Sequence, residues 1–502
     1  MRLTRMLYHA AEWRAWRRLV RKQMRKLVVK EFLVCGLAAI ALAAPLGETR
    51  AQGRPTQLAW PPELMTNLEK LRDAALSSDY AWRQVAHLTE NIGPRLSGSP
   101  QAQQAVDYVA AEMRRLGLEV KLQKIMVPHW VRGEERAKLT EFPGQAPGTT
   151  QKIVLAALGN SAATPAEGLT AEVVVVNSFD DLPVLGREKV AGRIVLFNNK
   201  FDKRMAAQGH AFEAYGRAVV YRYGGAKAAK ELGAVGSLIR SVGNADYRLP
   251  HTGNSQAAGI PAAAVTAEDA DLLADLTRQG RVVMNLVLTP QTLTDEVSYN
   301  VIADLKGSEH PEQIVIVSGH LDSWDLGTGA IDDAAGVAVA MQAANLYKQL
   351  GLRPKRTLRV IAWMNEENGL RGGNAYASEY KSDLANHVGA IESDSGAGHP
   401  LGFQGLFNPA AAEALRPLAR VLAPIGVDLL QSRGDAEADI EPMGGSGVPL
   451  FGLMQDGRTY FDYHHTSADT LDKIHPQELA ENAAAMAVLS YALADMPQVL
   501  PH

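Results

Sequence analysis

Residues 314–333, IVIVSGHLDSWDLGTGAIDD, decide how the chain is expected to fold. The stretch opens with four β-branched apolar residues, Ile314 to Val317, a run long enough for a fully buried strand. Gly319 ends this run, and one imidazole and four carboxylates follow within fourteen residues: His320, Asp322, Asp325, Asp332 and Asp333. Nitrogen and oxygen donors together suit zinc. The stretch therefore indicates a metal site, although solvated loop acids are about as common when such a stretch stands alone.

Three further predicted strands are also followed by acids or histidines. Thr357–Trp363 leads to Glu366 and Glu367, His387–Ile391 leads to Asp394, and Val448–Leu453 precedes His464 and His465. Helices are expected between the strands, at residues 336–350, 373–380, 409–422 and 476–494. This alternation predicts an α/β fold with a mostly parallel central sheet flanked by helices. Because such sheets bind ligands at the carboxyl ends of their strands, we expect these side chains to share one crevice and to hold a pair of metal ions.

The block of residues 136–290 has a different pattern. Short Val/Ile strands recur, glycine and alanine are frequent, and clusters of ionisable residues are scarce. The block is predicted to be an inserted β-rich domain without chemistry of its own. Its single histidines, His210 and His251, are expected to be structural or surface residues. The helices at 62–90 and 101–116 would then belong, with the last part of the chain, to the α/β domain.

The N-terminus has the features of a signal peptide. Residues 1–31 carry ten Lys/Arg and two Glu, and the apolar run Phe32–Ala44 that follows is too short to cross a bilayer comfortably. Ala51 ends a small-x-small cleavage site, and Met24 offers an alternative start. We therefore expect an exported protein, periplasmic or secreted, with no stable membrane insertion after cleavage. An uncleaved membrane anchor is the competing interpretation.

The predicted organisation is a signal peptide at residues 1–51 and an α/β domain at 52–135 and 291–502, which carries the metal site in its second part and is interrupted by the inserted domain at 136–290. Removing the signal shifts the net charge from −4 to about −12, because residues 1–51 hold eleven Lys/Arg and three Asp/Glu. Such an acidic protein is not expected to bind nucleic acid. The only cysteine, Cys35, lies in the signal, so thiol catalysis, thiolate metal ligation and disulfides are excluded for the mature chain.

Five stretches resemble the di-zinc exopeptidases of the aminopeptidase type. They are SGHLDSWDLGTGAIDDAAG, LRPKRTLRVIAWMNEENG, IESDSG, YHHTSADT and the loop NIGPRLSGS. The resemblance covers nearly all of the mature chain, and its nearest members are carboxypeptidases. It implies a phosphorylase/hydrolase-like zinc peptidase fold, two zinc ions per chain and a homodimer. The inserted block resembles the protease-associated domain of some members.

The resemblance also implies a metal ligand set. Asp332 bridges the two zinc ions, Glu367 and His465 complete one site, and His320 and Asp394 complete the other. Each ion then keeps three protein ligands and an open position, as in catalytic zinc sites.

Three neighbouring residues are assigned in the same way. Glu366 is the general base that activates a water bridging the metals. Asp322 holds the His320 imidazole without binding metal. His464 either donates a hydrogen bond to the tetrahedral oxyanion or has a structural role. The Asp332-Asp333 peptide bond resembles the non-proline cis bond of the family.

The expected function is therefore hydrolysis of dipeptides or short peptides by an exported di-zinc exopeptidase of the carboxypeptidase or dipeptidase kind. Aminopeptidase action on the same site is the alternative. A glutaminyl cyclase and a non-catalytic, receptor-like relative are less favoured. Glutaminyl cyclases of this fold work with one zinc ion, so a content of two ions per chain would argue against the first, and the presence of all five ligand types and Glu366 argues against the second. The inserted domain is expected to cover the crevice and limit peptide length, and to be dispensable for zinc binding.

Overall fold

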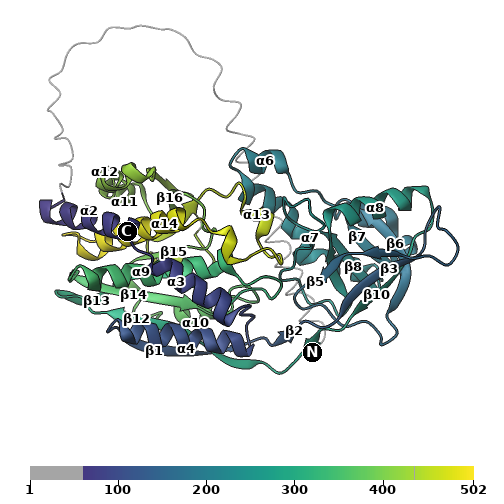
Figure 1. Cartoon of the computed structure of the whole chain (residues 1–502), viewed down its shortest axis with the longest axis horizontal. Coiled ribbons are helices and arrows are strands. Elements are labelled where there is room, and N and C mark those ends of the chain that lie inside the picture. Colours follow the sequence, from purple (N-terminus) through teal and green to yellow (C-terminus); the bar gives the residue numbers. More distant parts are fainter. Residues whose placement is uncertain (1–59, 435, 502) are drawn as a thin grey trace, which may run out of the picture. The chain divides into compact units, whose positions relative to one another are not determined.

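The structure, a computed structural model, describes residues 60–434 and 436–501. The predicted signal peptide, with Met24 and Cys35, lies outside these residues. Within them, no helix combines the length and the apolar composition needed to cross a membrane. The described residues build two eight-stranded sheets and the helices that cover them (Figure 1).

The first sheet has the strand order β1-β12-β14-β13-β15-β18-β16-β17. Its strands are β1 (Glu119–Val127), β12 (Glu296–Leu305), β13 (His310–His320), β14 (Arg356–Trp363), β15 (His387–Glu392), β16 (Pro400–Leu406), β17 (Leu429–Ser432) and β18 (Leu450–Gln455). The four central strands run parallel, whereas β1 and β12 on one side and β16 on the other run antiparallel to their inner neighbours. The centre of the sheet is thus parallel, as predicted, and antiparallel strands flank it on both sides, a detail that strand composition does not reveal.

Helices cover both faces of this sheet. The strand β14 is buried along its whole length, and its residues alternate between two apolar clusters. On one face, Leu358 and Val360 share a cluster with five helices: α2 (Pro62–Leu76), α3 (Tyr80–Ala86), α4 (Pro100–Arg115), α9 (Ala335–Gln349) and α14 (Pro476–Asp495). On the other face, Ile361 and Trp363 pack with Tyr376 of α10 (Arg371–Glu379). Side chains in strands alternate between faces, so one strand contributes to both layers.

Two predicted helices are interrupted. The single helix expected over residues 62–90 ends at Leu76, and α3 starts after the polar break at 77–79. The helix expected over 409–422 divides into α11 (Pro409–Ala414) and α12 (Pro417–Leu422). Proline has no N–H to donate, so Pro417 begins a new helix instead of continuing the old one.

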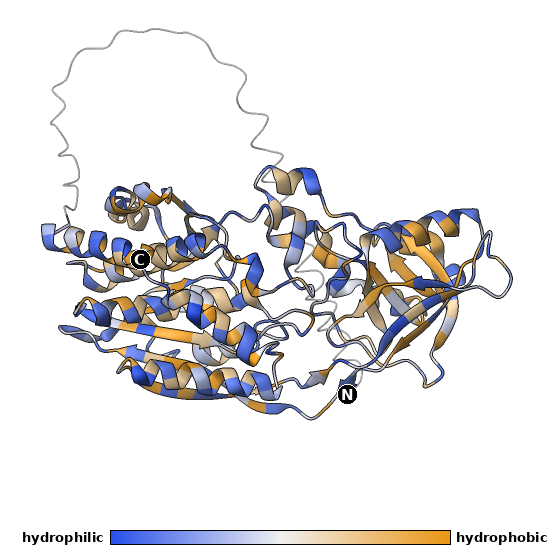
Figure 2. Ribbon diagram, viewed as in Figure 1, coloured by the Kyte–Doolittle hydropathy of each residue, from blue (hydrophilic) through white to orange (hydrophobic). Residues whose placement is uncertain are grey.

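The second sheet is formed by the block in which short strands recur. Its order is β4-β3-β10-β6-β7-β8-β9-β5, and its strands are β3 (Glu135–Glu141), β4 (Gln151–Ile153), β5 (Leu155–Ala157), β6 (Leu169–Val176), β7 (Ile194–Phe197), β8 (Gly236–Arg240), β9 (Ala262–Val265) and β10 (Val283–Leu288). The apolar strands stand out in Figure 2. A short ribbon of β2 (Trp130–Val131) and β11 (Gln291–Thr292) pairs the chain where it enters and leaves this sheet.

This block contains more helix than the sequence suggested. Its helices are α5 (Asp181–Val190), α6 (Lys203–Ala207), α7 (Ala211–Glu231) and α8 (Ala267–Gln279). The helix α7 spans 21 residues even though Gly216 and Gly224 weaken the helical pattern of its sequence. A Cβ on the next glycine, Gly225, would lie 3.0 Å from the Phe197 ring, so this residue lets α7 pack closely on β7.

Candidate metal centre

The side chains predicted to bind metal come together beyond the carboxyl ends of the parallel strands. His320 is the last residue of β13, Glu367 follows β14, and Asp394 follows β15. Asp332 lies just before α9, and His465 follows the short helix α13 (Tyr460–Tyr463). The central strands are parallel, so these residues meet at one edge of the sheet.

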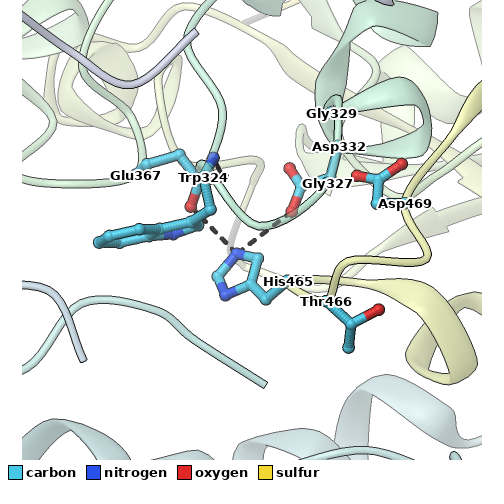
Figure 3. Close-up of a pocket in the computed structure, with 8 residues that line it drawn as sticks. All are labelled: Trp324, Gly327, Gly329, Asp332, Glu367, His465, Thr466 and Asp469. Carbon is cyan, nitrogen blue, oxygen red and sulfur yellow. Dashed lines mark hydrogen bonds and ion pairs between the residues drawn. The ribbon is translucent and has the colours of Figure 1, made fainter. Parts of the chain in front are cut away.

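Asp332 lies between two groups of potential ligands. Its Oδ1 is 2.9 Å from Nε2 of His320, which is also 3.2 Å from Oδ1 of Asp394. Its Oδ2 is 3.2 Å from Nε2 of His465, which is also 3.0 Å from Oε2 of Glu367. Figure 3 shows the Asp332 and Glu367 carboxylates directed at the same His465 nitrogen. Each oxygen of Asp332 thus serves one group.

These two groups fit zinc. In each of them one donor atom per residue lies within 4.8 Å of the others, and Asp332 belongs to both. Asp332 Oδ2 is buried but accepts no hydrogen bond, which is costly unless another partner satisfies it. The donors are imidazole nitrogens and carboxylate oxygens, the ligands of catalytic zinc sites. A cation shared by these residues would also offset the repulsion among three carboxylates, of which Asp332 and Glu367 are buried and Asp394 partly so.

Glu366 belongs to neither group, although it precedes Glu367 in the chain. Burial raises the pKa of its carboxyl well above the usual range, and the negative charge of Asp394 raises it further. A carboxyl that shares the crevice but makes no contact with the ligand nitrogens is available to accept a proton.

Asp322 makes different contacts from those expected. The Nδ1 of His320 donates to the main-chain carbonyl of Asp322 at 3.0 Å, whereas the Asp322 carboxylate lies 3.9 Å from that nitrogen. The carboxylate instead accepts from the amides of Asn365 at 2.7 Å and Glu366 at 3.1 Å, and from the Ser97 hydroxyl at 2.8 Å. The main chain of Asp322 therefore orients His320, and its side chain holds the loop that carries Glu366.

His464 stacks on His465, with ring centroids 3.7 Å apart. Its Nε2 lies 3.3 Å from Oδ2 of Asp332, while its Nδ1 is buried without a hydrogen-bond partner. Burial lowers the pKa of His464 well below its usual value, and the neighbouring His465 lowers it further. His464 thus lies against the Asp332 carboxylate that both groups share.

Close packing fixes the segment that carries Asp332. The Asp332-Asp333 peptide bond is cis, as the resemblance implied. The Asp333 carboxylate accepts from the amides of His320 at 2.9 Å and Gly336 at 2.8 Å. A Cβ on Gly336 would lie 2.0 Å from the Ser393 carbonyl oxygen, so only glycine fits at the start of α9.

Arg95, in the NIGPRLSGS loop, was not singled out by its sequence. Its side chain is fully buried and donates to the carbonyls of Leu321 at 2.8 Å, Thr328 at 2.7 Å and Gly329 at 2.8 Å. Asp469 supports the same loop, because its Oδ1 accepts from the amides of Ala330 and Ile331 at 2.8 Å each. These two residues hold the chain between His320 and Asp332 in place.

The second-sheet block also contributes two side chains that pack against the candidate metal centre. His251 is buried, and its ring stacks against that of His465 with centroids 5.1 Å apart. Arg222 of α7 is buried beside both histidines. His251, which was expected to be a structural or surface residue, is buried here, whereas Arg222 had no local signal in the sequence.

Comparison with known proteins places these observations in a family. Residues 300–490 match the model of peptidase family M28. Human carboxypeptidase Q is 38% identical over 427 residues, which are 84% of this chain and 86% of the human protein. The crystal structure of a peptidase M28 precursor from Shewanella amazonensis superimposes with a TM-score of 0.82 at 38% identity, over 88% of this chain and 98% of the other. A zinc aminopeptidase from Bacillus subtilis shares the fold, with a TM-score of 0.61 at 21% identity, over 84% of this chain and 98% of the other.

Proposed function

The chain belongs to peptidase family M28 and is a metallo-exopeptidase, and on this premise we propose that it is an exported di-zinc enzyme that cleaves dipeptides or short peptides. Asp332 carries the proposal, since its two oxygens face two separate groups of nitrogen and oxygen donors. His320 and Asp394 would hold one zinc ion with Asp332, and Glu367 and His465 the other.

The chain's own residues supply the remaining chemistry. Zinc, when bound, acidifies water and polarises the carbonyl of the scissile bond. Glu366 takes the proton from the attacking water and passes it to the leaving amine. The contacts of Asp322 with the amides of Asn365 and Glu366 fix the position of this base.

We propose a C-terminal or dipeptide specificity, following the resemblance to carboxypeptidase Q, with aminopeptidase action as the second candidate. The second-sheet block is proposed to be an inserted protease-associated domain. Export through the segment 1–51 and assembly as a homodimer complete the proposal. Size-exclusion chromatography with light scattering tests the assembly, and N-terminal sequencing of the mature protein tests the cleavage after Ala51.

A metal count combined with a peptide panel tests the proposed reaction. The purified enzyme should contain two zinc ions per chain and should hydrolyse unblocked dipeptides. Blocking the C-terminal carboxylate should abolish cleavage, whereas blocking the N-terminal amine should reduce it less. The reverse pattern would assign the enzyme as an aminopeptidase. One zinc ion per chain, or no hydrolysis in a zinc-loaded sample, would contradict the proposal.

A further inference from the structure

The loop that follows β8 in the second sheet holds the main chain at His465. The amide of Thr252 donates to the His465 carbonyl at 2.8 Å, and His465 Nδ1 lies 3.3 Å from the Thr252 carbonyl, its acceptor. His251 forms a backbone bridge with Thr466. His465 has a φ of 60°, a left-handed conformation that non-glycine residues rarely adopt without support from their surroundings. This support comes from residues 213 positions away in the chain.

Arg222 lies at the centre of this contact. Its Nη1 donates to the Tyr215 hydroxyl at 2.6 Å and to Nε2 of His251 at 2.9 Å, and lies 3.2 Å from Nδ1 of His465. Its Nε donates to the Asn254 carbonyl at 3.2 Å. Arg222 is only 8% exposed, yet it forms no ion pair with a carboxylate among the described residues. A buried guanidinium that contacts mainly rings and a carbonyl serves to fix those groups in place.

The loop is shaped to admit this guanidinium. Gly253 has a φ of 134°, and a Cβ there would lie 2.3 Å from Nη1 of Arg222. Any other residue at this position would displace the arginine. The glycine and the arginine therefore form one fitted contact between α7 and the loop.

The three neighbouring histidines are not a third metal site. His251, His464 and His465 could in principle share an ion, since their nitrogens lie within 4.8 Å of one another. However, Nε2 of His251 accepts a hydrogen bond from Arg222, which places a permanent positive charge where the ion would bind. His251 is instead the link through which Arg222 supports the stacked His465 ring.

We infer that Arg222, acting through His251 and Thr252, is a positioning residue for the His465 zinc ligand, so that one of the two zinc sites is completed by the second-sheet block. This inference rests on the proposed ligand role of His465. The other site, with His320 and Asp394, has no such dependence, because His320 is held by the Asp322 carbonyl and the amide contact of Asp333. The two sites should therefore respond differently to changes in α7.

The positive charge of Arg222 and its support of His465 have opposite effects on zinc affinity, so they predict opposite results when Arg222 is replaced. Loss of a nearby positive charge, by itself, would strengthen zinc binding. Loss of support for a ligand weakens metal binding, typically by about 10–100-fold for residues that orient zinc histidines. A weaker site in Arg222→Met can therefore come only from lost positioning.

The test is a competition between the purified full-length protein and a zinc chelator, which gives the dissociation constant of each bound ion. We expect Arg222→Met to raise the dissociation constant of one zinc ion by about 10–100-fold and to leave that of the other ion unchanged. Arg222→Lys should recover part of the loss, because an ammonium can still donate to Tyr215 and His251. Saturating zinc should restore most of the turnover of Arg222→Met. Arg217→Met removes an exposed arginine of the same helix, paired with Glu213, and should change neither constant.

Two further variants make every outcome decisive. His251→Phe keeps a ring against His465 but removes the acceptor for Arg222. It should therefore weaken binding of the zinc ion at the His465 site, and it provides this test even if Arg222→Met does not fold. In a Glu367→Ala background, where only the His320 site remains, Arg222→Met should have no effect. Unchanged or tighter binding of both ions in Arg222→Met and His251→Phe would overturn the inference. Failure of the unmodified protein to bind two zinc ions would instead overturn the proposed function.

Discussion

Glu366 and Glu367 are neighbours in the chain but have different surroundings in the crevice. Glu367 Oε2 lies 3.0 Å from Nε2 of His465, whereas Glu366 belongs to neither group of donors among the described residues. Glu366→Gln should therefore keep two zinc ions and lower kcat by about 10²–10⁴-fold, the usual contribution of a general base. Glu367→Gln is the matched control and should lose zinc as well as activity. Near-normal turnover of Glu366→Gln would remove this residue from the mechanism.

Asp332 is the one side chain that both ligand groups share. Asp332→Ala should lower the zinc content at both sites and reduce thermal stability, because an ion that binds only the native state stabilises it by about 2.7 kcal/mol at 100 times its dissociation constant. The unmodified protein treated with a chelator should lose the same stabilisation. Zinc analysis and thermal unfolding, with and without chelator, measure both effects. A variant that keeps two ions and its melting temperature would show that Asp332 is not the bridge.

Among individual residues, those that directly follow a strand could be placed best from the sequence. His320, Glu367 and Asp394 could be placed in one crevice because each follows a recognisable apolar strand. Arg222 and His251 could not, because their proximity to His465 depends on how α7 and its neighbouring loop pack, and neither residue has a local pattern. Asp322 was assigned to the right neighbourhood, but a sequence does not distinguish a contact by its side chain from one by its main chain.

Among the structural elements, the start of α9 has the tightest packing near the ligands. Gly336→Ala would place a methyl group 2.0 Å from the Ser393 carbonyl and 2.3 Å from the Asp333 carboxylate. Because the Asp333 carboxylate is held by the amide of His320 and the Ser393 amide is bonded to the Ser318 carbonyl, neither neighbour can move freely, so we expect destabilisation of roughly 3 kcal/mol or more, with loss of zinc. Gly216→Ala is the control: this helical glycine of α7 has no atom within 4 Å of its added Cβ, so alanine should stabilise the protein by roughly 0.5–1 kcal/mol. Chemical denaturation of both variants measures the difference, and equal stabilities would contradict the packing argument.

The helices and strands also show which elements the hydrophobic periodicity of a sequence can predict and which it cannot. The buried strands, such as β14, and the amphipathic helices, such as α4, were predicted within one or two residues. The weakly apolar strands β16 and β17, the last two at one side of the sheet, and most of α7 were missed, because glycine and polar residues reduce their periodicity. The direction of β12 against β14 was not predictable, since pairing is decided by connections distant in the chain.

For the whole molecule, the second-sheet block was expected to be dispensable for zinc binding. The contacts of Thr252 and Arg222 with His465 lead to a different expectation. Replacing residues 136–290 by a short linker should lower the zinc content towards one ion per chain and reduce activity on peptides of every length. Zinc analysis of the folded deletion protein measures this. Two tightly bound ions in the deletion protein would show that the second-sheet block does not support a zinc site and at most covers the crevice.

A point change at the boundary tests whether the same block limits peptide length while the zinc sites stay intact. Arg132 directly follows β2, in the ribbon that leads into the second sheet. It forms an ion pair at 2.7 Å with Asp325, which lies in the loop between His320 and Asp332, and both side chains are largely buried. Asp325→Asn keeps the shape but removes the charge, which should loosen this link and admit longer chains. We expect the ratio of kcat/KM for a decapeptide to that for a dipeptide to rise several-fold, with two zinc ions still bound. Asp271→Asn, which breaks an ion pair with Arg240 within the second-sheet block, should leave the ratio unchanged. An unchanged ratio in zinc-replete Asp325→Asn would contradict the role of this link in selecting short peptides.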